Sequence, residues 1–321
     1  MTTIRVANLN AYKLGRAARG TSCWNARVTA IREVSPDILA LQEVVVDEHT
    51  TPRAAWDGEA ATVIQDLAQA CGLTADIGES VAYPHRTAMA ANAHRAWWTA
   101  LLWNPDTVRL LPASYRPFGA PDFWHGCAVA RFDIGAKEPL SVASYHGDPF
   151  RPGFRYDEAV RLKGAFRASK AAGGVQRAII MGDFNSISAA EVDGPGGGRR
   201  FYDAEPYTDL VDHDDLEYQV KRVVEGEAPL ADREPTKILL RRGFFVDAAA
   251  HLGAPWQPTV GHWEDGQGDP DPWGLRRIDL GLASRPVAPA LTAYGAHHSA
   301  AARKASDHVP IWMDVNPSAI L

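Results

Sequence analysis

Polar side chains stand at the ends of several short apolar segments of the sequence. In "RAIIMGDFNS", residues 177–186, four apolar residues lead through a glycine into Asp183 and Asn185. The other polar residues in such places are Asn10 after "RVANL", Glu43 after "ILALQ", His146 after "SVASY", and Asp279, Asp307 and His308 at the start of two later segments. If those two later segments run antiparallel to the others, all these groups meet at one edge of the fold, where α/β sheets expose ligand sites.

Each of these residues has a plain structural interpretation when it is taken alone. An aspartate at a strand end commonly caps a turn or a helix. Asn10 alone fits a turn, Glu43 a solvated strand end and His146 a hydrogen-bonded structural histidine. The combination favours one shared site, because unrelated caps have no reason to comprise carboxylates, two amides and two histidines together.

The carboxylates in this set suit a divalent metal ion. Proteins usually hold Mg²⁺ by one or two carboxylates together with water and substrate phosphate, in near-octahedral geometry. We expect Glu43 to be the leading ligand and Asp307 the next. As a Lewis acid, such an ion lowers the barrier to attack on a phosphoryl group by several kcal/mol.

The remaining groups suit attack of water on a phosphate ester. Asp183 is expected to orient or deprotonate the water, and Asn185 to hold that water or a phosphate oxygen. His308 is expected to donate to a non-bridging oxygen as charge gathers in the transition state, with Asp279 fixing its tautomer.

The motifs "LNAY", "LQEV", "SYH", "GDFNS", "RIDLGLAS" and "SDHVPI" occur in the order found in the endonuclease/exonuclease/phosphatase superfamily, which the chain resembles from residue 4 to residue 315. That superfamily includes DNase I-like nucleases, abasic-site endonucleases, sphingomyelinases and inositol-polyphosphate 5-phosphatases. The resemblance implies an α/β (α+β) fold, a four-layer sandwich of two packed mixed β-sheets flanked by helices. It also implies Mg²⁺- or Mn²⁺-dependent cleavage of a phosphate ester by in-line attack of water.

The resemblance also implies roles for individual residues. Asn10 and Glu43 match the metal-site pair of the family, and Asp183 and Asn185 match the pair that activates water. The terminal acid, the metal-side acid and the catalytic histidine of the family are matched, in that order, by Asp279, Asp307 and His308.

His146 matches the histidine of DNase I-like members that contacts phosphate and protonates the leaving group. Glu79 stands near the place of the carboxylate that would orient this histidine. No core motif position is missing. A non-catalytic binding protein on the same fold is therefore a less favoured alternative to an active hydrolase.

The charge balance favours a small phosphorylated or nucleotide-like substrate. The formal net charge is −6 and the sequence pI is near 6.0, whereas proteins that bind along a nucleic-acid backbone often have a pI above roughly 9. A DNase I-like or repair-type endonuclease or exonuclease is the alternative. Four arginines are candidate substrate ligands, with solvated side chains as the equal alternative: Arg86, Arg95, Arg151 and Arg155.

Hydrophobic periodicity predicts the elements that position these residues. We expect helices over 24–34, 56–71 and 156–172, and strands at 4–10, 37–44, 97–103, 107–111, 127–134, 140–146 and 177–185, with further elements at 244–252, 277–284 and 308–315. The stretch 187–243 is interpreted as an insertion with one helix, within a single domain that spans residues 1–321.

The remaining features indicate a globular chain outside the membrane. Hydrophobic residues make up 46 % and charged residues 22 % of the sequence, and no apolar run approaches the ~20 residues that cross a bilayer. The N-terminus has no signal-peptide pattern, and the three cysteines show no paired spacing. A reduced, cytoplasmic location is the expectation, and the sequence does not specify the oligomeric state.

Overall fold

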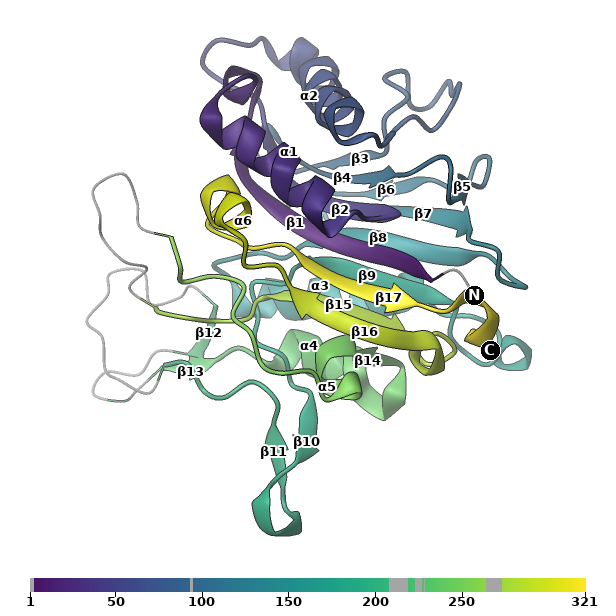
Figure 1. Cartoon of the computed structure of the whole chain (residues 1–321), viewed down its shortest axis with the longest axis vertical. Helices are drawn as coiled ribbons and strands as arrows, with labels where there is room; N and C mark the ends of the chain where they lie inside the picture. The colour runs from purple at the N-terminus through teal and green to yellow at the C-terminus, as the bar shows by residue number, and fades with distance from the viewer. Residues whose placement is uncertain (1–2, 93–94, 208–218, 223–226, 228, 264–272) are drawn as a thin grey trace.

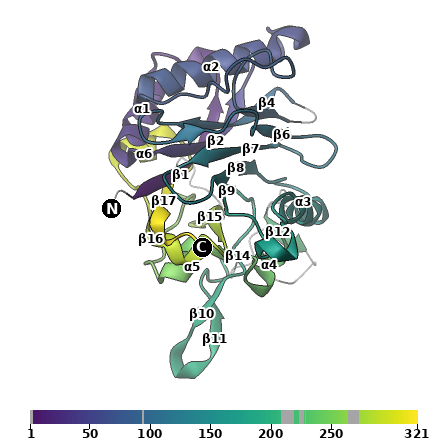
Figure 2. The ribbon, with the colours of Figure 1, turned by 90° about the vertical axis from the view of Figure 1, so that its right-hand side faces the viewer.

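The computed structural model describes residues 3–92, 95–207, 219–222, 227, 229–263 and 273–321. Two mixed β-sheets pack face to face, and helices cover the outer face of each sheet (Figures 1 and 2). The four-layer sandwich implied by the sequence motifs is confirmed.

The first sheet is built around β1 (Ile4–Leu14), which pairs in parallel with β2 (Ile38–Val45) and antiparallel with β17 (Ile311–Val315). Its six strands follow the order β16 (Leu291–Ala296), β17, β1, β2, β4 (Trp97–Trp103) and β3 (Met89–Ala91). Parallel pairing puts the ends of β1 and β2 at the same edge of the sheet, and antiparallel pairing brings the start of β17 to that edge.

The second sheet is built around β9 (Ala178–Asp183), which pairs in parallel with β8 (Leu140–His146) and antiparallel with β15 (Asp279–Ser284). Its strands follow the order β14 (Phe245–Asp247), β15, β9, β8, β7 (Cys127–Asp133) and β5 (Arg109–Leu110), with β6 (Arg116–Phe118) also pairing with β7. A Cβ at Gly182 would lie 1.9 Å from the carbonyl oxygen of Tyr145. Glycine at this position therefore allows the close approach of β9 to β8.

Apolar side chains from both sheets fill the space between them. The largest buried cluster among the described residues is formed there by side chains such as Val6, Leu101, Phe132, Met181 and Met313. The side chains on the outer face of each sheet pack against the helices and form two further clusters, one for each sheet. The strands are buried on both faces for this reason, which explains their nearly continuous apolar sequences.

Helices α1 (Ser22–Val34) and α2 (Trp56–Cys71) cover the first sheet, and the short helix α6 (Ala300–Ala305) packs against α1. Helices α3 (Pro152–Ala165) and α4 (Glu234–Leu240) lie side by side over the second sheet (Figure 2). Helix α5 (Ala248–Leu252) follows β14 and contacts β16.

Several elements differ from the prediction, among them β3. Helix α3 begins four residues earlier than expected and ends at Ala165, and both β16 and α6 were missed. Within the stretch 187–243, the hairpin of β10 (Glu191–Asp193) and β11 (Arg199–Phe201) projects from the body of the molecule (Figure 1). A second short pair consists of β12 (Val220–Arg222) and β13 (Leu230–Ala231).

Helix α4 is part of the outer helical layer and not of an appendage. Its Leu239 is fully buried in the cluster between α3 and the second sheet. The stretch 187–243 therefore combines a projecting hairpin with an integral helix. Within the described ranges, no helix is both long enough and apolar enough to span a bilayer.

Candidate active site

The two sheets bring the predicted site residues to one edge of the sandwich. Antiparallel pairing sets Asp279, the first residue of β15, directly opposite Asp183, the last residue of β9. Parallel pairing sets His146, the last residue of β8, beside Asp183. The expected convergence of these strand ends is therefore present in the structure.

Asp183 lies at the centre of the group. Its Oδ2 accepts a hydrogen bond of 3.1 Å from Asn10 Nδ2 and lies 3.5 Å from His146 Nε2 and 3.8 Å from His308 Nε2. Burial raises the pKa of Asp183 to about 7, with His308 opposing the shift and Asp279 adding to it. A carboxylate with a pKa near neutrality is suited to accept a proton from water.

Asn185 is fixed by contacts at both ends of its amide. Its backbone N–H donates to Asp183 Oδ1 at 2.9 Å, its Nδ2 donates to the carbonyl of Gly147 at 3.0 Å, and its Oδ1 accepts from Gln219 Nε2 at 3.1 Å. Its backbone is left-handed, with φ 46. Strained backbone held by surrounding contacts is typical of functional sites.

Glu43 and Asp307 form the part of the site that suits a metal ion. Glu43 accepts hydrogen bonds from Asn10 Nδ2 at 3.2 Å and from the backbone N–H of Lys13 at 3.0 Å. Burial raises the pKa of Glu43, and the nearby Asp307 raises it further. Neither carboxylate forms an ion pair with a lysine or arginine within the described part of the chain. Two neighbouring carboxylates without such a partner are the kind of donor set that a divalent cation neutralises.

The side chains of the described residues contain no cluster of three His, Cys, Asp or Glu residues arranged to enclose a metal ion. Mg²⁺ usually keeps several waters and takes only one or two protein carboxylates. The residues present, Glu43 and Asp307 with the amide of Asn10 beside them, fit such an open site.

His308 is oriented by a chain of buried polar groups. Its Nδ1 lies 2.7 Å from Asp279 Oδ2, and Asp279 Oδ1 accepts a hydrogen bond of 3.0 Å from Asn8 Nδ2. Burial alone would lower the pKa of His308, but Asp279 and Asp307 outweigh it and raise the pKa well above its ordinary value. This arrangement places a proton on Nδ1 and directs Nε2 toward Asp183.

His146 has a different electrostatic environment. Its ring stacks on His125, with centroids 4.0 Å apart and 10° between the planes. Burial lowers the pKa of His146 well below its ordinary value, and the two neighbouring histidines contribute. Burial also lowers the pKa of His125 to about 3. Both stacked rings are therefore neutral near pH 7. Glu79, which the sequence suggested as the carboxylate that orients His146, is exposed. The side chain that packs against the His146 ring is that of His125.

The four candidate arginines occupy different environments. Arg155 is fully buried, and its guanidinium donates to Asp232 at 2.8 Å and to the carbonyls of Asp148 and Pro149. With a further bond to the carbonyl of Val220, four of its five N–H donors are bonded inside the fold. The structure therefore corrects the expectation that Arg155 binds substrate: it anchors the loop after β8. Arg86 is exposed and paired with the equally exposed Asp76 at 2.9 Å.

The other two arginines lie nearer the histidine pair. Arg95 is exposed, and its charge contributes to the lowered pKa of His125. Arg151 pairs with Asp148 and stacks over the ring of Trp124, 4.2 Å from its centroid. Trp124 directly precedes His125 in the sequence.

The sequence analysis missed several supporting residues. Asn8 lies two residues before Asn10 on the same strand, so a period of two would have placed both side chains on one face. Ser306 Oγ donates to the carbonyl of Asn10 at 2.7 Å and accepts from the backbone of His308. No local signal identified His125, whose Nδ1 contacts Asn92 Nδ2 at 2.9 Å across 33 positions of sequence.

One family of known proteins matches the chain over nearly its whole length. The sequence model of the Endonuclease/Exonuclease/phosphatase family matches residues 7–308. The chain belongs to this family. Members of the family are phosphoester hydrolases, and they include phosphatases, nucleases and abasic-site endonucleases. No curated protein matches the chain by sequence.

Solved structures of the Endonuclease/Exonuclease/phosphatase family share the whole fold at low identity. A family protein from Bacteroides vulgatus aligns with a TM-score of 0.60 at 13 % identity, over 98 % of this chain and 99 % of that one. A mannosyl-6-phosphatase from Bacteroides thetaiotaomicron aligns with a TM-score of 0.56 at 13 % identity, over 98 % and 100 %. An AP endonuclease from Archaeoglobus fulgidus aligns with a TM-score of 0.55 at 17 % identity, over 98 % and 99 %.

Proposed function

We propose that the protein is a divalent-metal-dependent hydrolase that cleaves a phosphate ester by attack of water. The proposal rests on the position of Asp183, whose carboxylate lies within 4 Å of Asn10, His146 and His308 at the edge shared by the two sheets. Glu43 and Asp307 are the residues that would hold Mg²⁺ or Mn²⁺. A bound ion would supply Lewis-acid stabilisation of charge on the phosphoryl oxygens.

The side chains divide the reaction between them. Asp183 accepts the proton of the attacking water, and its raised pKa matches that task near neutral pH. Asn10 holds the carboxylate of Asp183 through Nδ2. Asn185, fixed by Gly147 and Gln219, keeps a second Nδ2 proton for the water or for a phosphate oxygen.

The two histidines have distinct parts in this proposal. His308 is held charged by Asp279 and donates from Nε2 to a non-bridging oxygen as charge develops there. His146 is neutral, so it contributes a hydrogen bond to the phosphate and is not a reservoir of acidic protons near pH 7. This refines the leaving-group role that the family motif implies.

We favour a small phosphorylated substrate over nucleic acid. The net charge of −6 opposes binding along a phosphate backbone. Arg155 is held inside the fold, which leaves Arg95, whose charge acts on His125, and Arg151, which stacks on the adjacent Trp124, as candidate substrate ligands. Both a mannosyl-6-phosphatase and an AP endonuclease share this fold, so the fold itself is compatible with either kind of substrate.

The decisive experiment measures hydrolysis of p-nitrophenyl phosphate and bis-p-nitrophenyl phosphate with Mg²⁺, with Mn²⁺ and with EDTA. We expect turnover that requires the metal and falls by at least ~10²-fold in Asp183→Ala. The exposed variant Asp106→Ala, at another loop, is the control. Metal-independent turnover, or full activity of Asp183→Ala, would refute the proposal. A panel of plasmid DNA, RNA, nucleotides and sugar phosphates then separates small substrates from nucleic acid.

A further inference from the structure

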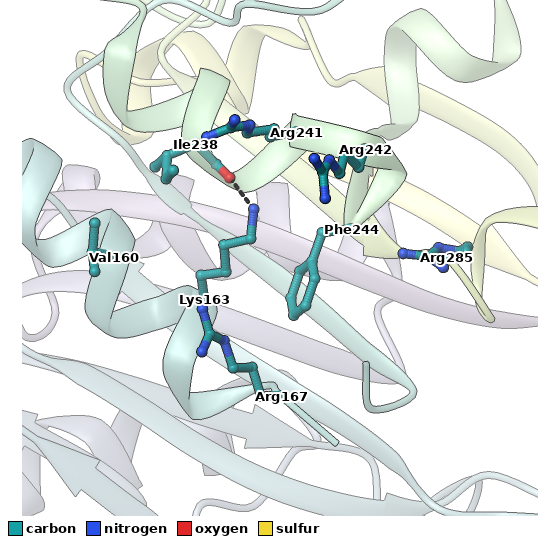
Figure 3. A pocket seen from close by; sticks show the side chains of 8 residues that line it. All are labelled: Val160, Lys163, Arg167, Ile238, Arg241, Arg242, Phe244 and Arg285. Carbon is teal, nitrogen blue, oxygen red and sulfur yellow. Dashed lines mark hydrogen bonds between the residues drawn. The ribbon is translucent and has the colours of Figure 1, made fainter. Parts of the chain in front are cut away.

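A basic pocket lies on the outer side of the second sheet (Figure 3). It has a volume of about 400 Å³, and α3, the end of α4 and the residue that follows β15 form its walls. None of its lining side chains is acidic, and five are basic: Lys163, Arg167, Arg241, Arg242 and Arg285. This density of positive charge contrasts with the net charge of −6 of the whole protein.

The pocket is remote from the active site. Asp279 begins β15 at the catalytic edge, and Arg285 follows Ser284 at the other end of the same strand. With a rise of about 3.3 Å per residue, the two lie roughly 20 Å apart. The pocket is therefore no subsite of the catalytic centre.

The cations of the pocket lack counter-charges. Within the described part of the chain, none of the five forms an ion pair with an aspartate or glutamate. Lys163 Nζ donates to the carbonyl of Ile238, and Arg285 Nε donates to the carbonyl of Gly243 at 3.2 Å. Burial lowers the pKa of Lys163, and Arg241, Arg167 and Arg242 lower it further. These groups repel one another, so a bound anion would relieve the repulsion.

The backbone after α4 directs two consecutive arginines into the pocket. Consecutive residues of a regular helix point about 100° apart, yet Arg241 and Arg242 both line this hollow. The backbone of Arg242 is in the left-handed conformation, with φ 61°, and so is that of Gly243, with φ 62°. The ring of Phe244 also lines the pocket, and its centroid lies 5.0 Å from the Lys163 ammonium. The pocket is thus a concave site with cations on several walls.

We propose that this pocket binds a small phosphate-bearing anion with at least two negative charges. Guanidinium groups bind phosphate oxygens through paired N–H donors, and several of them around one hollow match a compact, multiply charged group. The volume falls within the range of small-molecule sites, roughly 300–1,000 Å³. A concave pocket favours a compact anion over the flat surface of a membrane.

Calorimetric titration with inorganic pyrophosphate in EDTA tests the proposal. We expect binding to the wild-type protein that is at least tenfold tighter than binding of sulfate, and at least tenfold weaker in R241Q/R242Q. The control R199Q/R200Q makes the same charge change at two consecutive exposed arginines of the β10–β11 hairpin, and it should bind like wild type. Asp183→Ala should also bind like wild type, which separates this pocket from the catalytic centre.

Three outcomes would overturn the proposal. The first is equal pyrophosphate binding by wild type and R241Q/R242Q, and the second is equal loss in both double variants, which would reflect net charge alone. The third is binding to phosphatidylserine vesicles that depends on Arg241 and Arg242 while pyrophosphate does not bind. Melting curves of each variant verify that the fold is intact.

Discussion

The imidazole rings of His125 and His146 are stacked in parallel, with 4.0 Å between their centroids. His125 is held in turn by Asn92, at 2.9 Å from Nδ1. The stack restricts the rotation of His146 and excludes water from one of its faces. We therefore propose that His125 is a positioning residue, which acts on the reaction through His146.

Replacement of His125 by alanine should reduce kcat about tenfold, which corresponds to ~1.4 kcal/mol, with little change in KM. Removing the second buried ring admits water, so the pKa of His146 should rise toward its ordinary value. Steady-state kinetics and NMR titration of the His146 ring measure the two effects. The exposed His49 supplies the control His49→Ala. An unchanged His146 titration together with unchanged kcat would contradict the positioning role.

Replacement of Asp279 by asparagine should reduce kcat by ~10²-fold or more, because an asparagine no longer holds the charged form of His308. The matched variant Asn8→Ala removes the hydrogen bond of 3.0 Å to the other oxygen of Asp279 and leaves the charge of Asp279 in place. It should cost activity by a much smaller factor. Comparable losses in both variants, at unchanged melting temperature, would show that the charge of Asp279 is unimportant.

The predictable part of the site consists of residues next to sharp changes from apolar to polar sequence. Asn10, Glu43 and Asp183 are such residues. Strand pairing within each sheet and the face-to-face packing of the two sheets bring them together. His125 lies in a loop and gains its place from a contact with Asn92. Contacts between loops leave no periodic signal in the sequence, so this residue was not predictable.

The errors in the fold have similar physical causes. Helix α3 buries the charged residues Arg155 and Glu158. Because charged residues occupy buried positions, the sequence lacks the regular apolar periodicity from which the start of a helix is predicted. Their burial depends on distant partners such as Asp232. Strand β16 is only partly buried and α6 is rich in alanine, so neither shows a distinct pattern, and tertiary pairing determines their structure.

Replacement of Glu43 by glutamine should raise the Mg²⁺ concentration for half-maximal activity by ~10-fold or more, since a charged ligand becomes neutral. Mg²⁺ should also raise the melting temperature of the wild-type protein more than that of Glu43→Gln, a readout that needs no turnover. Glu138→Gln, at an exposed position, controls for the loss of one charge. Identical Mg²⁺ dependence in Glu43→Gln and wild type would remove Glu43 from the ligand set.

Glu158 should make the stability of the protein depend on pH. Burial raises the pKa of Glu158 from 4.5 to about 7, against hydrogen bonds from Trp124, Tyr145 and Asp148. Between these values the folded state binds more protons than the unfolded state, so the free energy of unfolding should fall as pH rises from about 4.5 to about 7. At 1.36 kcal/mol per unit the full effect is roughly 3 kcal/mol.

The variant Glu158→Gln lacks this titrating group, so its unfolding free energy should decline less steeply over this range. The decline due to Asp183, whose pKa is also raised to about 7, should remain. Urea unfolding at pH 5 and pH 8 measures the difference for both proteins. The comparison of slopes is independent of any constant loss from the altered hydrogen bonds. Parallel curves for the two proteins would show that Glu158 does not titrate in this range.

Replacement of Arg277 by leucine should destabilise the protein by about 3–5 kcal/mol, because it leaves two buried carboxylates without a counter-charge. Arg277 is fully buried and bonds Asp203 and Asp247, each at 2.6 Å. Asp203 belongs to the stretch 187–243, so this cluster ties the base of the projecting hairpin to the second sheet. The exposed pair of Arg109 and Asp133, at 2.8 Å, provides the control Arg109→Leu, which should cost no more than about 1 kcal/mol.

The same cluster predicts the effect of shortening the stretch 187–243. Deletion of residues 193–235 removes Asp203 and Asp232, the buried partners of Arg277 and Arg155. We therefore expect a large loss of stability, contrary to the behaviour of a simple insertion. Shortening only the "GPGGG" turn, 194–198, removes no buried residue and should leave the melting temperature within a few degrees. Thermal unfolding of both deletions distinguishes these cases, because a detachable insertion would tolerate both equally.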